Sequence, residues 1–180
     1  IQSHWTPEPG DLCLDIGFGP GTWTMVALAR GARTISFDPK PNACAMLMDL
    51  MLLNRFTRGW IVPAGVWSRT DVLAFGANGF REDNMKDRRP VVQLDEFFSS
   101  DPPRRFDYIN MDAEWAEAEI VRGARIILER YHPKLIIEIH DELYAGEITE
   151  ELGKFGRPHW KYDVMREGGF LIGTPKRLTI

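Results

Sequence analysis

The stretch LCLDIGFGPGTW, residues 12–23, places a glycine-rich turn directly after a short apolar run. The run at residues 12–16 predicts a buried β-strand. Val26, Ala27 and Ala29 then have helix-compatible spacing and predict a helix over residues 22–30. Strand, tight turn and helix in this order are typical of the first unit of a doubly wound α/β fold.

The same alternation continues along the chain. Apolar runs predict strands at residues 33–37, 60–66, 106–111 and 134–139, and Pro41 is well placed to open a helix over residues 41–54. A third predicted helix carries its apolar residues on one face, namely Ile120, Val121, Ala124, Ile127 and Leu128. Alternating strands and helices require a largely parallel sheet.

Two regions depart from this alternation. Short β segments at residues 72–75 and 91–93 flank a polar stretch at 76–90. This stretch has the composition of a mobile loop and is a candidate lid over a substrate-binding site. Residues 159–165 and 170–173 surround Arg166-Glu167-Gly168-Gly169 and predict a hairpin. We therefore expect a Rossmann-like α/β fold whose doubly wound, mostly parallel sheet carries a C-terminal antiparallel hairpin strand.

Composition narrows the class of protein. A chain of 180 residues with 44% hydrophobic and 27% charged residues fits one soluble globular domain over residues 1–180, although its start at Ile1 leaves room for a missing N-terminal segment. The net charge of −4 offers no broad attraction for nucleic acid or anionic lipid, so we expect neither partner. Two cysteines exclude a disulfide scaffold and favour a cytoplasmic compartment, while oligomeric state stays open.

The glycine turn is the predicted cofactor site. Ligands of open parallel sheets bind beyond the carboxyl ends of the strands, and Gly17, Gly19 and Gly21 allow a close backbone approach there. A dinucleotide turn would read G-x-G-x-x-G, whereas this one reads G-x-G-x-G after Asp15. S-adenosylmethionine carries a carboxylate that loop amides can bind and cationic groups that Asp15 can balance. The pattern favours this cofactor over NAD.

Asp38 ends the second strand, where an acid can accept hydrogen bonds from ribose hydroxyls. NAD sites use the same arrangement, and capping of the following helix is an alternative role for Asp38. The expected cofactor-binding residues are Asp15, Gly17, Phe18, Gly19, Gly21, Thr22, Asp38, Asn42, Val66 and Asp112.

Three linked segments between about residues 11 and 141 carry a family resemblance. They are LDIGFGPGTWT with FDPKPNA, then VQLDEF at 92–97, and DYINMDAEWAE at 107–117 continued by EIVRGA and PKLIIEIH. The chain resembles the FkbM family of methyltransferases. The resemblance implies a class I methyltransferase domain that uses S-adenosylmethionine to methylate a hydroxyl of a small molecule, such as a sugar or secondary metabolite. Trp115 stands where the family usually has glycine, so its indole could reshape acceptor access or stack on a substrate.

A hydroxyl acceptor needs a base within hydrogen-bond reach. The candidate catalytic residues, all at the ends of the two strands at 106–111 and 134–139, are Asp112, Glu114, Glu138 and His140. Glu138 lies in an otherwise apolar strand, so it should have a partner or a raised pKa. Histidine suits a general base near neutral pH, and a surface position is the alternative for His140. A divalent metal bound by these carboxylates stays an option without diagnostic spacing, and no metal ligand is assigned.

Other residues have less specific interpretations. Glu117, Glu119, Arg122 and Arg125 lie opposite the apolar stripe of their helix, and a solvated face suits most of them. Trp5, Trp23 and Trp67 could line the pocket or belong to the core. Two other function classes stay open, a non-catalytic cofactor-binding module of a larger protein and an NAD-dependent oxidoreductase.

Overall fold

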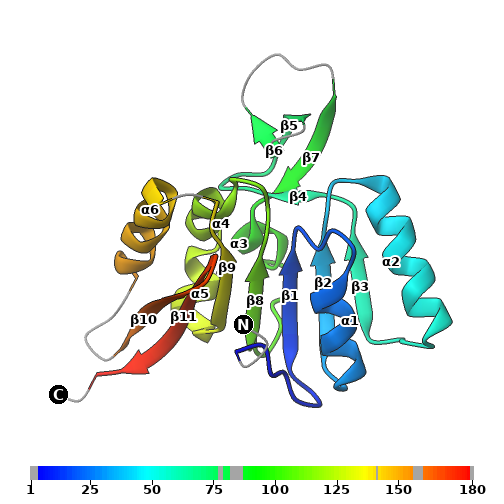
Figure 1. Cartoon of the computed structure of the whole chain (residues 1–180), viewed down its shortest axis with the longest axis horizontal. Helices are drawn as coiled ribbons and strands as arrows, with labels where there is room; N and C mark the ends of the chain where they lie inside the picture. The colour runs from blue at the N-terminus through cyan, green and yellow to red at the C-terminus, as the bar shows by residue number, and fades with distance from the viewer. Residues whose placement is uncertain (1–3, 77–78, 82–86, 141, 156–159, 179–180) are drawn as a thin grey trace.

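A seven-stranded sheet forms the centre of the computed structural model, which describes residues 4–76, 79–81, 87–140, 142–155 and 160–178 (Figure 1). Across the sheet the strands are β10 (Trp160–Glu167), β11 (Phe170–Arg177), β9 (Lys134–Glu138), β8 (Tyr108–Met111), β1 (Leu12–Ile16), β2 (Arg33–Phe37) and β3 (Gly59–Val62). The strands from β9 to β3 run parallel, while β11 is antiparallel to β9 and to β10. The predicted Rossmann-like fold with its C-terminal hairpin is confirmed.

Strand β1 lies at the switch point of the sheet. It pairs with β2 on one side, Ile16 opposite Phe37, and with β8 on the other, Ile16 opposite Met111. The chain therefore leaves β1 toward one edge and later returns to its other side. Ligands of such sheets bind where the carboxyl ends of the two flanking strands diverge.

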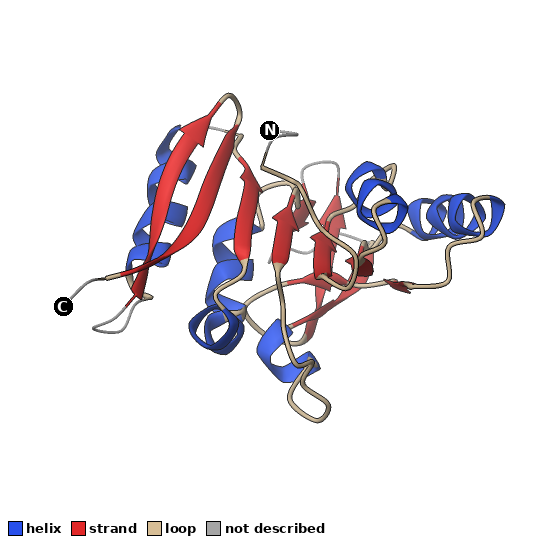
Figure 2. Cartoon of the chain, turned by 90° about the horizontal axis from the view of Figure 1, so that it is seen from below, coloured by secondary structure: helices blue, strands red, loops and turns tan. Residues whose placement is uncertain are grey.

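Helices cover both faces of the sheet (Figure 2). The helices are α1 (Thr22–Ala29), α2 (Pro41–Leu53), α3 (Leu94–Phe97), α4 (Glu117–Gly123), α5 (Arg125–Tyr131) and α6 (Glu142–Gly153). Side chains alternate along a strand, so Leu14 joins the apolar cluster that contains α4, α5 and α6, whereas Cys13 packs with Ala27 of α1. Alternation thus divides β1 between two apolar clusters.

A small second sheet lies beyond the carboxyl ends of the parallel strands (Figure 1). It contains β4 (Gly65–Val66), β7 (Arg88–Val92), β5 (Asp71–Gly76) and β6 (Gly79–Arg81) in that order. A loop was predicted over residues 76–90. This prediction was wrong for residues 79–81 and 88–90, which belong to strands β6 and β7 and pair with β5. Residues 77–78 and 82–86 of that stretch lie outside the described residues.

The predicted strand at residues 60–66 is divided between the two sheets. Strand β3 stops at Val62, and Gly65–Val66 pairs with β7 instead. Pro63 separates the two pieces, and proline has no N–H to donate to a strand ladder. The break redirects Gly65 and Val66 to the end of the parallel sheet, where they meet the ligand region.

The helix predicted around Ile120–Leu128 is two helices, α4 and α5, which meet at Ala124. The two oxygens of the Asp95 carboxylate accept hydrogen bonds from the amides of Ile126 (2.8 Å) and Ile127 (3.0 Å). This contact from α3 satisfies amides at the start of α5, which a continuous helix would have paired internally. The break therefore depends on a residue about thirty positions away, which the local pattern does not reveal.

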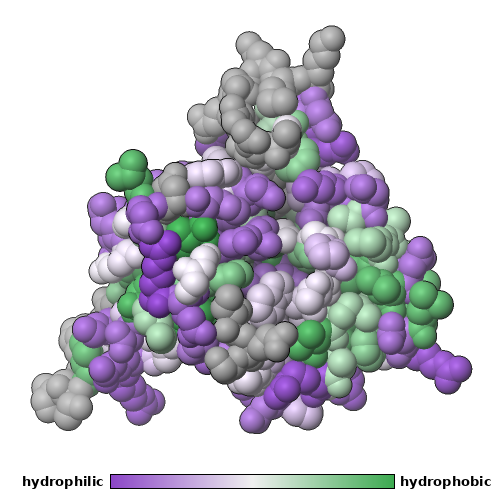
Figure 3. All heavy atoms as spheres, viewed as in Figure 1, coloured by the Kyte–Doolittle hydropathy of each residue, from purple (hydrophilic) through white to green (hydrophobic). Residues whose placement is uncertain are grey.

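Apolar side chains gather over α1 and α2 on the otherwise mostly hydrophilic face shown in Figure 3. Those exposed on α2 are Met46, Met48, Leu52 and Leu53, whereas Leu47 and Met51 are buried. Within the described residues, none of the helices combines the length and apolar character that crossing a bilayer requires.

Candidate active site

A cavity opens at the carboxyl ends of β1, β2 and β8, under the small sheet. Its walls are formed by Ile16, Gly17, Gly19, Pro20, Phe37, Asp38, Pro39, Lys40, Gly65, Val66, Phe75, Gly79, Asp112, Ala113, Glu114 and Ala116. The structure thus brings together six of the predicted site residues, namely Gly17, Gly19, Asp38, Val66, Asp112 and Glu114.

The glycine turn is held between the ends of β2 and β8. Gly17 has φ +76°, and a Cβ at this position would lie 1.9 Å from the carbonyl oxygen of Asp112. The amide of Gly17 donates a hydrogen bond to the carbonyl of Phe37 (2.8 Å). Both the left-handed backbone and the missing side chain are therefore required for the turn to line the cavity.

Asp38 connects the glycine turn to the start of α2. One carboxylate oxygen accepts a hydrogen bond from the amide of Gly19 (3.1 Å), and the other accepts one from the amide of Lys40 (2.8 Å). Helix α2 has Lys40 at its N-cap and no side-chain cap, so the alternative capping role for Asp38 is not observed. The nearly buried carboxylate instead forms part of the cavity wall.

Asp15 is fully buried beneath the turn and is not part of the cavity wall. One carboxylate oxygen accepts hydrogen bonds from the amide (2.9 Å) and hydroxyl (2.7 Å) of Thr24, and the other accepts one from the Asn110 side chain (2.9 Å). Burial raises the pKa of Asp15 to about 6, against the effect of these hydrogen bonds. The carboxylate joins α1 to β8. The prediction that Asp15 faces the ligand space was therefore wrong.

Four further predicted cofactor residues lie outside the cavity wall. The Phe18 side chain is buried in the apolar cluster of α1 and α2, while Thr22 and Asn42 are exposed near the starts of those helices. Gly21 is required for packing, because its φ is +83° and a Cβ there would lie 2.7 Å from Leu47. Phe18 and Gly21 thus contribute to packing around the turn and not to the cavity wall.

The predicted tryptophans also lie away from the cavity. Trp5 packs edge-on against Trp23, with ring centroids 5.4 Å apart, in the cluster that contains Cys13. Trp67 is buried in the largest apolar cluster. The three tryptophans therefore pack in or against the apolar core and do not line the pocket.

Asp112, Glu138 and His140 converge at the ends of β8 and β9. One potential ligand atom from each of these half-buried residues lies within 4.8 Å of the others. Burial and a hydrogen bond shared with Glu138, together with the charges of Glu138 and Glu114, raise the pKa of Asp112 to about 7. Glu138 was expected to have a partner, and Asp112 is that partner.

The side chain of His140 is only 19% exposed, so the surface alternative does not hold. Its Nε2 lies 3.7 Å from Oε1 of Glu117, and the Trp115 ring lies 5.2 Å from the imidazole. Glu117 is fully buried, accepts a hydrogen bond from the amide of Ala113 (2.7 Å), and has a pKa raised by burial. Glu117 is thus an exception to the solvated face predicted for most of these residues, because it supports the turn after β8.

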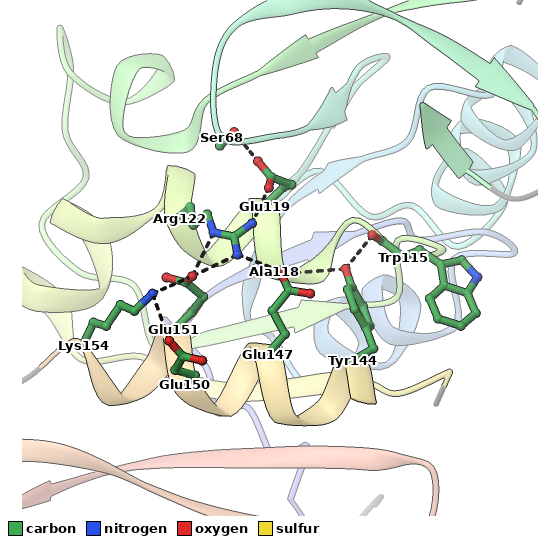
Figure 4. A network of polar contacts seen from close by, with 10 residues as sticks. All are labelled: Ser68, Trp115, Ala118, Glu119, Arg122, Tyr144, Glu147, Glu150, Glu151 and Lys154. Atoms are coloured by element: carbon green, nitrogen blue, oxygen red, sulfur yellow. Dashed lines mark hydrogen bonds and ion pairs between the residues drawn. The ribbon is translucent and has the colours of Figure 1, made fainter. Parts of the chain in front are cut away.

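Trp115 and Glu114 both have left-handed backbones, with φ of +74° and +51°. The hydroxyl of Tyr144 donates to the carbonyl of Trp115 and accepts from the amide of Ala118 (3.2 Å), which fixes the turn to α6 (Figure 4). The indole is 41% exposed. The turn thus presents an aromatic ring beside His140, next to the cavity wall.

Arg122 joins α4 to α6 in a network of charges (Figure 4). Its guanidinium pairs with Glu119 of α4 and with Glu147 (2.6 Å) and Glu151 (2.9 Å) of α6. The prediction of a solvated face holds for Arg125, which is 68% exposed and pairs with Glu129 (3.2 Å). Arg122 instead fixes the helix that carries Tyr144.

Sequence reasoning missed several cavity residues. Phe75 and Gly79 reach the cavity from the small sheet, and Nζ of Lys40 lies 5.9 Å from the centroid of the Phe75 ring. The sequence signals were an aromatic residue in a strand-like segment beside a glycine, and a lysine two residues after Asp38. No local pattern shows that the small sheet folds over the parallel one.

One family model matches the sequence over more than half of its length. Residues 63–169 match the Methyltransferase FkbM domain. No curated protein matches the chain.

Solved structures show the same fold. Methyltransferase FkbM from Methylobacillus flagellatus superimposes with a TM-score of 0.72 at 18% identity, over 91% of this chain and 43% of that one. An rRNA methylase from Streptococcus thermophilus gives 0.61 at 14% identity over 99% and 95%. A Streptococcus mutans protein solved in complex with SAH gives 0.62 at 12% identity over 98% and 96%. The chain spans less than half the length of the Methylobacillus protein.

Proposed function

The chain belongs to the FkbM methyltransferase family, and from this premise we propose that it methylates a hydroxyl group of a small molecule with S-adenosylmethionine. The observation that carries the proposal is the cavity at the switch point, which Gly17, Asp38 and Asp112 line together.

The cavity wall has the groups that this cofactor needs. The Asp38 carboxylate at the end of β2 suits the two ribose hydroxyls, and the adjacent apolar side chains of Phe37, Val66 and Phe75 suit an adenine ring. Glycine-turn amides suit the carboxylate of the amino acid part. We propose that Asp15 acts indirectly, by fixing Thr24 and Asn110 around the turn.

The acceptor side lies at the ends of β8 and β9. The bound cofactor would supply a methyl group on a sulfonium, which is a good leaving group. Asp112 and Glu114 line the cavity and can orient an acceptor hydroxyl, while the cluster with Glu138 and His140 can take up its proton. With its pKa near 7, Asp112 changes charge in the pH range where such a base works.

Charge at the site favours a small neutral or cationic acceptor. Three carboxylates, those of Asp112, Glu114 and Glu138, lie close together at this end of the sheet. They would repel a phosphate backbone, and the net charge of −4 adds to that repulsion. The exposed Trp115 indole offers a flat apolar face that suits a sugar ring or an aromatic acceptor.

An acceptor screen tests the proposal. The purified chain is incubated with S-adenosylmethionine labelled in its methyl group and with panels of phenols, catechols, sugars and hydroxy acids, and methylated product and SAH are measured. We expect labelled product from at least one hydroxyl class, and loss of that product with Asp38→Ala. SAH binding without turnover on any panel would instead indicate a non-catalytic module, and NAD binding would indicate an oxidoreductase.

A further inference from the structure

The cluster of Asp112, Glu138 and His140 combines two carboxylates and an imidazole at the edge of the cavity. We propose that these three side chains bind one small divalent cation of the Mn²⁺ type. The role of this cation rests on the proposed function, in which it would act on the acceptor side of the site. Binding of the cation itself can be measured without any methyl transfer.

Spacing permits a single ion to contact all three residues. The potential ligand atoms lie within 4.8 Å of one another. Two ligands of one small divalent ion, each at about 2.0–2.2 Å, lie at most about 4.0–4.4 Å apart. The most distant ligand atoms would therefore have to move together by up to about 0.4–0.8 Å, which side-chain rotation can supply.

His140 provides a separate observation. Its Nε2 is buried and lies 3.7 Å from Oε1 of the fully buried Glu117, and the two atoms form no hydrogen bond. In metal sites the ring nitrogen that does not bind the ion faces a carboxylate, which orients the histidine. Nε2 is therefore the nitrogen that Glu117 would hold, and Nδ1 is the one that would bind the cation. Glu117 would thus be a positioning residue.

The charge balance also favours a cation. Within the described part of the chain, neither Asp112 nor Glu138 forms an ion pair with lysine or arginine. Two adjacent, half-buried carboxylates without a cationic partner repel each other when both are ionised. A bound divalent ion would remove this repulsion and hold both residues in the charged form.

The mixed ligand set indicates which ion to use. Carboxylates suit Mg²⁺ and Mn²⁺, whereas imidazole suits first-row transition metals, so Mn²⁺ satisfies both preferences. Asp112 belongs to the cluster and to the cavity wall, so an ion bound there would lie beside the ligand space. Such an ion could orient an acceptor hydroxyl and lower its pKa. With the three cluster residues bound to the ion, Glu114 of the cavity wall would be the carboxylate left to take up the proton.

Titration with Mn²⁺ tests the proposal directly. The full chain is treated with EDTA, desalted and titrated with MnCl₂, while the electron paramagnetic resonance signal of free Mn²⁺ reports the unbound ion. We expect one Mn²⁺ per chain, with affinity at least about tenfold lower in Glu138→Gln and in His140→Ala. The matched variant Glu150→Gln changes a 76% exposed glutamate of α6 and should bind Mn²⁺ like the wild type.

Circular dichroism and SAH calorimetry in EDTA accompany each titration. A folded wild-type chain without saturable Mn²⁺ binding would overturn the metal site, as would binding that survives both cluster variants. SAH binding in EDTA would then still support the proposed function. Failure to bind SAH, with intact Mn²⁺ binding, would overturn the proposed function and leave the metal site standing.

Discussion

Gly17 at the end of β1 packs directly against the carbonyl oxygen of Asp112 at the end of β8, so closely that a Cβ on Gly17 would lie 1.9 Å from that oxygen. The glycine turn and the first residue of the acidic cluster are therefore in backbone contact. A side chain added at Gly17 would displace Asp112.

Gly17→Ala should weaken SAH binding by at least about tenfold and lower the free energy of unfolding by about 2 kcal/mol or more, because the left-handed backbone and the clash both oppose a side chain. Calorimetry and urea unfolding measure the two effects. Gly168→Ala is the matched control, since it also has a positive φ (+59°) but nothing within 4 Å of the added Cβ. Equal effects of the two substitutions would contradict the proposed contact.

Asp38→Ala should weaken SAH binding by about 1.5–3 kcal/mol, because charge-assisted hydrogen bonds of this carboxylate would be lost. The hydrogen bonds to Gly19 and Lys40 would be lost as well. Asp49→Ala, at an exposed position of α2, should bind SAH like the wild type. If Asp38→Ala kept full affinity, the assignment of the cavity to the cofactor would be wrong.

Asp112→Asn should change how stability depends on pH. The pKa of Asp112 is raised to about 7, so its protonated form stabilises the native state at low pH, and this contribution is lost as pH rises from about 4 to about 7. In EDTA, we expect a smaller fall in unfolding free energy over this range for the variant. Asp15, with a pKa near 6, contributes to both proteins, and the variant removes only the smallest cause of its shift, the charge of Asp112. Parallel curves from urea unfolding would refute the raised pKa.

Trp115→Gly should separate acceptor binding from cofactor binding. Glycine adopts the observed φ of +74° without strain, so the free energy of unfolding should change by no more than about 1 kcal/mol. Loss of the indole beside His140 should raise the KM for an acceptor found in the screen and leave the Kd for SAH unchanged. Trp115→Phe keeps an aromatic ring and should recover part of the acceptor affinity. An unchanged KM in both variants would exclude the ring from the acceptor site.

Arg122→Met should destabilise the junction of α4 and α6 by about 1–2 kcal/mol, because Glu119, Glu147 and Glu151 lose a shared, partly exposed partner. The loss should shrink at about pH 4, where the carboxylates begin to be protonated. Arg125→Met removes a more exposed pair and should cost less than about 0.5 kcal/mol. Urea unfolding at both pH values measures these differences, and equal values for the two variants would argue against the network.

Most of the fold could be predicted from the sequence because its signals are local. The apolar run of β1, the glycine turn and the apolar β9 each indicate their own structure, and alternation of strands and helices fixes a parallel sheet. Helix α6 was missed although Ala145, Ile148 and Leu152 have helical spacing. Of the small sheet, the segments at residues 72–75 and 91–93 were predicted as β structure. Their assembly into a second sheet was missed because β4 and β6 are only two and three residues long and depend on distant partners.

The candidate site was predicted only in part, because topology places residues at the strand ends but does not orient their side chains. Residues at the carboxyl ends of β1, β2 and β8 follow from topology, so Gly17, Asp38 and Asp112 were found. Whether a carboxylate faces the ligand or the protein depends on neighbours that are distant in sequence. Asp15 faces Thr24 and Asn110, and this orientation has no local signature.

The central claim is that the cavity binds S-adenosylmethionine, and calorimetric titration of the purified chain with S-adenosylmethionine, SAH and NAD tests it most directly. The account predicts saturable binding of the two adenosyl compounds, no binding of NAD, and SAH binding that is about 1.5–3 kcal/mol weaker in Asp38→Ala. A folded chain that binds NAD, or that binds neither adenosyl compound, would contradict it.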